Sequence, residues 1–143
     1  MKKRAVLLVF LISLTTFAQK QNKETNKTEI NQSTSFNFQR IIQLDEHKKN
    51  EDIIIGIEKQ TEKFELMIET SVSSGKLTIE IYDSNEKKQG TFSVGTQLNI
   101  QNFEYAHGKI NKSLIEPKAG NWKIKIIPIN AIGSIQIKTT SFF

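Results

Sequence analysis

The chain has 143 residues, with 20 basic and 15 acidic side chains and no cysteine. Its length suits one domain, which at this size buries roughly two-thirds of the surface that the unfolded chain exposes. The lack of cysteine excludes disulfides, a thiol nucleophile and a lipid-anchored cysteine, so stability must come from packing.

The first eighteen residues have the pattern of a secretory signal peptide. Met1–Arg4 is basic, Ala5–Leu14 is apolar except for Ser13, and Thr15–Ala18 is a polar exit with small residues. The apolar run is well short of the ~20 residues needed to cross a bilayer. We therefore expect an exported protein, secreted or periplasmic, with no transmembrane segment in the mature chain.

Removal of residues 1–18 also changes the charge balance. Three of the twenty basic residues lie in this leader and all fifteen acidic residues follow it, so the net charge falls from +5 to +2. A nucleic-acid-binding surface needs a concentrated basic face rather than a residual excess of charge. We expect no nucleic-acid partner.

Residues 19–35 are polar, and Ile30 is the only large apolar side chain among them. Such a segment cannot bury enough apolar surface to offset an ordering cost of about 1–2 kcal/mol per residue. We therefore predict a flexible N-terminal segment over 19–35 and a folded domain over 36–143.

Apolar and polar residues alternate through the rest of the chain, which is typical of strands that turn one face toward a core. The alternating runs lie at 36–44, 53–57, 64–72, 77–81, 92–94, 98–100, 110–114, 122–126 and 135–137. A helix is the alternative over 58–69, where helix formers are frequent, but the alternation continues to Val72 and favours a strand. Ser73–Gly75 then predicts a hairpin turn, with Leu77–Tyr82 as the returning strand.

These runs predict an all-β fold with seven to eight strands. Many short strands and few helix signals favour an antiparallel two-sheet β-sandwich, jelly-roll-like in outline. A sheet closed on itself is the alternative, but the turns are irregularly spaced. Because a buried Trp removes about 150–250 Å² from water, Trp122 is the predicted core anchor.

Two motifs stand out from the general alternation. One is a strand from Gly75 that ends at Asp83 and is followed by a hydrophilic loop, and the other is a Pro117-x-x-Gly120 turn before Trp122. Over residues 64–140 this combination resembles the β-sandwich accessory domains of exported proteins. It is similar to bacterial pre-peptidase C-terminal domains, more distantly to the P domains of proprotein convertases, and to small standalone secreted bacterial proteins of unassigned function. The resemblance implies a non-catalytic stabilising or binding module.

The sequence offers little for catalysis or metal binding. The only histidines, His47 and His107, are far apart in predicted loops, and no Gly-x-Ser-x-Gly elbow is present. Asp83, Asn85 and Glu86 could supply oxygen ligands for Ca²⁺, but they lack EF-hand spacing, and an Asx turn is the simpler interpretation. We expect neither an enzyme nor a cofactor or metal.

Exposed aromatic residues supply the candidate ligand-binding site, which consists of Tyr82, Phe103 and Tyr105. If Leu77, Ile79 and Ile81 face the core, strand alternation turns Tyr82 outward. We expect a binding or accessory module with a protein or glycan partner, and the alternative is a carbohydrate-binding module that uses these rings. A third class is an interaction protein that extends a partner's sheet through an edge strand, where Lys123 and Lys125 would protect an edge or solvate a face.

Overall fold

The computed structural model describes residues 34–96 and 105–143. The predicted leader, nearly all of the polar segment that follows it, the run at 98–100 and Phe103 lie outside these ranges. Every regular element in the described part is a strand, in order β1 (Ser35–Leu44), β2 (Glu51–Ile57), β3 (Lys63–Tyr82), β4 (Lys88–Thr96), β5 (Ala106–Ile115) and β6 (Gly120–Phe142). The predicted all-β fold is therefore confirmed, as is strand rather than helix at the start of β3. Within the described ranges, no helix has the length and apolar character needed to span a membrane.

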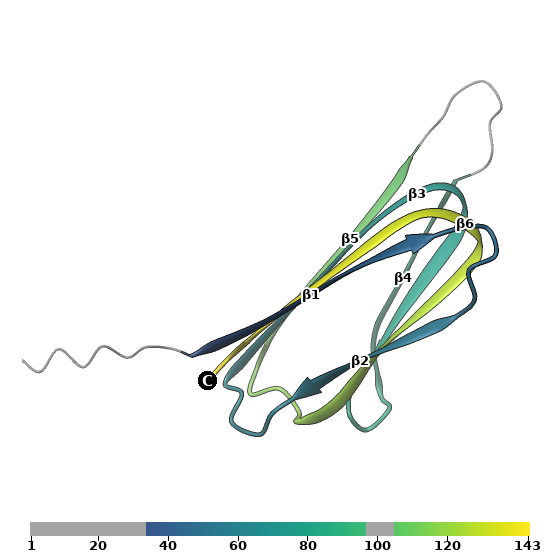
Figure 1. Ribbon diagram of the computed structural model, residues 1–143. Coiled ribbons are helices and arrows are strands. Elements are labelled where there is room, and N and C mark those ends of the chain that lie inside the picture. The colour runs from purple at the N-terminus through teal and green to yellow at the C-terminus, as the bar shows by residue number, and fades with distance from the viewer. Residues whose placement is uncertain (1–33, 97–104) are drawn as a thin grey trace, which may run out of the picture. The chain divides into compact units, whose positions relative to one another are not determined.

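Two long strands build both layers of the fold. One layer has the order β1–β6–β3–β5 and contains the second half of β6, the first half of β3 and the whole of β5. The other layer has the order β2–β6–β3–β4 and contains the first half of β6 and the second half of β3. All pairings are antiparallel. Figure 1 shows β3 and β6 curving side by side at one end of the molecule and returning in the second layer. When each half of β3 and β6 is taken as a segment, the two four-stranded layers have the jelly-roll connectivity that was predicted.

The described residues form six continuous strands rather than seven to eight, because β3 and β6 each join two of the predicted alternating runs. The predicted hairpin turn at Ser73–Gly75 is wrong, since β3 runs through it and only shifts its register against β6. Gly75 (φ 75°) and Gly133 (φ 155°) allow this bend. A Cβ at Gly75 would lie 2.1 Å from the carbonyl oxygen of Asn130, so the two bent strands touch through their backbones.

The core lies between the two layers and is rich in isoleucine. Its buried apolar residues are Ile42, Leu44, Ile53, Ile55, Ile57, Phe64, Leu66, Ile68, Val72, Leu77, Ile79, Ile81, Trp122, Ile124, Ile126, Ala131, Ile135 and Ile137. The ring centroids of Phe64 in one layer and Trp122 in the other are 6.1 Å apart, which places aromatic packing across the interface between layers. The prediction that Trp122 is a core anchor is confirmed: it is 4% exposed and its Nε1–H donates to the Lys118 carbonyl at 2.8 Å.

Polar side chains bridge the layers at both open sides of the sandwich. Arg40 of β1 pairs with Glu51 of β2, and the Lys112 ammonium of β5 donates to the Gln89 carbonyl of β4 at 2.8 Å. The outward residues Lys123 and Lys125 lie on β6, which is paired on both sides by β2 and β3. They therefore solvate a sheet face and do not protect an edge.

Candidate functional site

The two tyrosines, half-buried Tyr82 and exposed Tyr105, lie on opposite outer faces of the sandwich. Tyr82 points outward from the β2–β6–β3–β4 layer, whereas Tyr105, directly before β5, points outward from the β1–β6–β3–β5 layer. The structure therefore does not bring these two predicted site residues together, and Phe103 lies outside the described residues.

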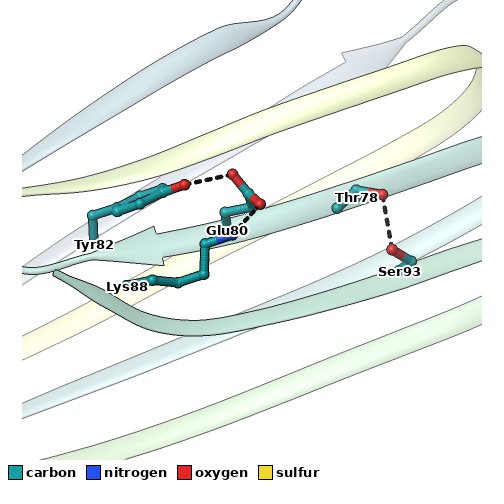
Figure 2. A network of polar contacts seen from close by, with 5 residues as sticks. All are labelled: Thr78, Glu80, Tyr82, Lys88 and Ser93. Atoms are coloured by element: carbon teal, nitrogen blue, oxygen red, sulfur yellow. Dashed lines mark hydrogen bonds and ion pairs between the residues drawn. The ribbon is translucent and has the colours of Figure 1, made fainter. Parts of the chain in front are cut away.

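A network of polar and cation–π contacts occupies Tyr82 (Figure 2). Its hydroxyl donates to a Glu80 carboxylate oxygen at 2.7 Å, and Lys88 donates to the other oxygen of that carboxylate. The ammonium groups of Lys88 and Lys123 lie 5.6 Å and 5.2 Å from the Tyr82 ring centroid. Strand alternation correctly predicted that Tyr82 faces outward, but its ring already has two cationic partners.

Titration of this network follows from the same contacts. The hydrogen bond to Glu80 raises the pKa of the Tyr82 hydroxyl above its ordinary value of 10.0, and the hydrogen bond from Lys88, followed by that from Tyr82, lowers the pKa of Glu80. Hydrogen bonding to Glu80 likewise raises the pKa of Lys88. At neutral pH Tyr82 is thus a neutral donor beside a satisfied ion pair, an arrangement that holds β3 to β4.

Tyr105 differs from Tyr82 because it is part of an open aromatic platform. It is 61% exposed, and its ring stacks on the His107 ring with centroids 6.4 Å apart and planes inclined by 23°. The two residues lie two positions apart on one face of the chain, so alternation turns both side chains outward. The sequence suggested a turn for His107, but it lies within β5.

Polar side chains from four strands continue this platform into what we call the Tyr105 face. Its outward residues are Tyr105, directly before β5; His107, Lys109, Asn111 and Ser113 on β5; Lys63, Glu65, Met67, Glu69 and Ser71 on β3; Ser134, Gln136, Lys138 and Thr140 on β6; and Asn37, Gln39, Ile41 and Gln43 on β1. The pairing register aligns them in rows across the sheet, for example His107, Ser71, Ser134 and Gln43. Hydroxyl and amide groups dominate these rows.

Two shallow depressions lie on the Tyr105 face. One, of about 380 Å³, adjoins the platform and is lined by His107, Lys109, Glu69, Ser71, Ser134 and Gln136. The other, of about 440 Å³, lies further along the same strands and includes Met67, Asn111, Lys138 and Thr140. From Ser71 to Glu65 the two depressions cover roughly 20 Å of strand at about 3.3 Å per residue. The face is therefore long enough for an extended ligand.

The charges of the Tyr105 face are nearly balanced. Each of its two acids is paired with a lysine: the Lys109 ammonium lies 2.7 Å from Glu69 and the Lys63 ammonium lies 2.6 Å from Glu65. Lys138 adds one further positive charge. The hydrogen bond from Lys109 and its positive charge lower the pKa of Glu69, so both members of this pair are ionised at neutral pH. A face of this kind can donate and accept hydrogen bonds without attracting a strongly charged ligand.

A larger depression, of about 890 Å³, lies at the bent end of the sandwich. Its walls include Ser74, Lys76, Val94, Ile129 and Ile132, and Thr96 borders it. Because residues 97–104 follow directly after Thr96 and lie outside the described part of the chain, we assign no site to this depression.

Asp83, the centre of the suggested Ca²⁺ site, uses both carboxylate oxygens for hydrogen bonds within the turn that follows it. Its Oδ1 accepts from the backbone N–H groups of Asn85 at 2.9 Å and Lys87 at 3.0 Å, and its Oδ2 accepts from Gln89 at 2.8 Å. This is the geometry of an Asx turn. Among the described residues, no three His, Cys, Asp or Glu side chains are grouped so that they could hold a metal ion.

Comparisons with known proteins give the chain no family. No family model matches the sequence, and no curated protein matches it. Among solved structures, it is similar to the lipase BlEst2 of Bacillus licheniformis in its propeptide form, with a TM-score of 0.43 and 16% identity over 77% of this chain and 22% of that one. The chain thus spans less than a quarter of the length of that lipase, and a likeness at this TM-score supports no inference about function.

Proposed function

We propose that the protein is an exported, non-catalytic binding module whose ligand surface is the Tyr105 face. The observation that carries the proposal is the exposed Tyr105–His107 platform beside a depression lined by hydroxyl and amide groups. Binding sites commonly combine an apolar or aromatic surface with a few placed polar groups that orient the ligand. Jelly-roll sandwiches also serve as lectin domains, which is support by analogy of fold alone.

A neutral glycan is the ligand class that fits this surface best. The apolar face of a sugar ring can pack on an aromatic ring, while its hydroxyl groups exchange hydrogen bonds with side chains such as Ser71, Ser134 and Gln136. The small net charge of the face favours a neutral ligand, and its length favours an oligosaccharide over a single sugar. Tyr105 is the predicted site residue that supports this proposal, whereas the contacts of Tyr82 argue against a similar role.

Export is part of the proposal and follows from the pattern of residues 1–18. Expression in a bacterial host followed by N-terminal sequencing tests it, and the expected product begins at Gln19. The suggested relation to pre-peptidase C-terminal domains and convertase P domains stays a prediction, because no family model matches the chain.

A glycan array with matched variants tests the ligand assignment. We expect the unmodified protein to select a subset of neutral oligosaccharides, and Tyr105→Ala to weaken that binding by about tenfold or more, as loss of an anchor ring in a binding surface does. Tyr82→Ala is the control, because it removes the same side chain from the opposite face and should leave the affinity within about twofold. An array without selective binding, or equal losses for both variants, would contradict the proposal.

A further inference from the structure

Among the described edge strands, β1 has the fewest features that protect against pairing with another sheet. Among the described residues it pairs only with β6, and that pairing runs through all ten of its residues without a register shift. Its sequence contains one charged residue, Arg40, and no Gly, Pro or Lys. The other edges are interrupted: β2 carries two acids and Gly56, β4 contains Gly90, Gly95 and a register shift, and β5 carries Gly108 and two lysines. Edge strands normally rely on such features to avoid joining another sheet.

One hydrogen bond establishes which backbone groups of β1 are free. The Phe143 N–H donates to the Thr34 carbonyl at 3.0 Å, and these residues are opposite each other in the β1–β6 register. Since hydrogen-bonded and non-hydrogen-bonded pairs alternate in an antiparallel ladder, the even-numbered residues of β1 bond to β6. The odd-numbered residues direct their N–H and C=O groups to the open edge, and they are Ser35, Asn37, Gln39, Ile41 and Gln43.

We propose that the protein forms a symmetric dimer in which β1 pairs antiparallel with β1 of a second copy, with the two-fold axis at Gln39. This register pairs every odd-numbered residue with an odd-numbered residue of the partner, so all the free backbone groups of the strand are satisfied. The result is one continuous eight-stranded layer, built by joining two four-stranded layers of the type described. A two-fold interface of this kind requires a self-complementary surface.

The side chains of β1 have that self-complementarity. On the inner face, Phe36 is placed opposite the partner's Ile42, and Phe38 is placed opposite the partner's Arg40, where a cation–π contact can form. On the outer face, Gln39 meets the partner's Gln39 and Asn37 meets the partner's Ile41. No like charges oppose each other, whereas a two-fold axis at Arg40 would set two guanidinium groups side by side.

The exposed apolar side chains of β1 support a second copy of the chain as its pairing partner. Phe36 is 64% and Ile41 is 58% exposed, and they lie on opposite faces of β1 near its two ends. A partner strand of arbitrary sequence would need apolar residues at the positions opposite Phe36 on one face and opposite Ile41 on the other face. A second β1 strand does so by symmetry, because each exposed residue is covered by the opposite end of its partner.

Cysteine cross-linking tests the dimer and its register, since the chain has no native cysteine. In the proposed pair the two Gln39 Cα atoms are about 5.5 Å apart, which is within the range for a disulfide. Mild oxidation should therefore convert Gln39→Cys to a covalent dimer, while Thr91→Cys on the β4 edge should remain monomeric. Equal cross-linking of both variants, or none in either, would overturn the proposal.

Sedimentation velocity of the purified protein gives an independent readout without cross-linking. The unmodified protein should show a monomer–dimer equilibrium, and Gln39→Lys, which places two ammonium groups together at the axis, should raise its Kd by about tenfold or more. Thr91→Lys adds the same charge at another edge and should leave the Kd within about twofold. A protein that stays monomeric up to about 1 mM, the limit of weak association, would overturn the proposal.

Discussion

At the scale of single residues, Trp122 is the clearest stabilising side chain. Its ring packs against Phe64 across the layers and its indole N–H is satisfied by Lys118. Trp122→Ala should lower the free energy of unfolding by roughly 3–5 kcal/mol, the range for deletion of a buried large aromatic. Chemical denaturation measures this loss. Ile54→Ala, at a position that is 55% exposed, is the control and should change the free energy of unfolding by less than about 0.5 kcal/mol. An unchanged denaturation midpoint for Trp122→Ala would show that this ring does not stabilise the core.

Asp83 makes folding stability depend on pH. Burial opposes its charged form, but hydrogen bonds from the Lys87 and Asn85 backbone and the Gln89 side chain outweigh burial and lower its pKa below the ordinary 3.8. A lowered pKa in the folded state means that Asp83 contributes stability above pH 3.8 and that this contribution is lost as the pH falls through the folded-state pKa.

Denaturation midpoints measured at several pH values check this contribution. Asp83→Asn lacks the carboxylate, so it should be less stable than the unmodified protein near neutral pH, and the difference should shrink as the pH falls below 3.8. A difference that is constant with pH would show that the negative charge of Asp83 is not what stabilises its turn.

The sequence predicted single-residue features where local pattern decides them. Alternation was sufficient to orient Tyr82 outward and Trp122 inward. It could not predict the lysines around the Tyr82 ring, because Lys88 comes from β4 and Lys123 from β6, and only strand pairing brings them together. The Tyr105–His107 platform was accessible to sequence reasoning, since the two residues share a parity, but His107 was assigned to a loop.

At the scale of elements, the bend shared by β3 and β6 determines the two-layer architecture. Gly75→Ala should cost more than about 2 kcal/mol, because a positive φ is strained for Ala and the new Cβ would meet the Asn130 carbonyl at 2.1 Å. Gly56→Ala on β2 is the matched control: the nearest atom to its Cβ is 4.0 Å away, so we expect no loss of stability. Thermal or chemical denaturation compares the two variants, and equal effects would contradict this view of the bend.

The bend also explains why the strand count differed from prediction. A Ser-Ser-Gly sequence suits both a hairpin turn and a bulge in a continuous strand, because each can use a glycine with positive φ. What decides between them is the backbone of Asn130 and Gly133 in β6, far along the chain. The hydrophobic pattern on either side of Gly75 was read correctly, but the direction of the chain between the two runs depends on this distant partner.

At the scale of the whole molecule, pairing order determines which side chains share a face. Composition and alternation predicted an all-β sandwich. They could not place Tyr82 and Tyr105 on opposite faces, since that depends on which half of β3 each layer contains. The proposed dimer extends the Tyr105 face further, because β1 forms one border of that face and would join the equivalent faces of two copies into one surface.

The central claim is that the Tyr105 face is the ligand-binding surface, and backbone NMR tests it most directly. In a ¹H–¹⁵N titration with the oligosaccharide bound best on the array, we predict that the largest shift changes cluster at His107, Ser71 and Gln136. Changes centred instead on Tyr82 and Lys88, on the opposite face, would contradict the account.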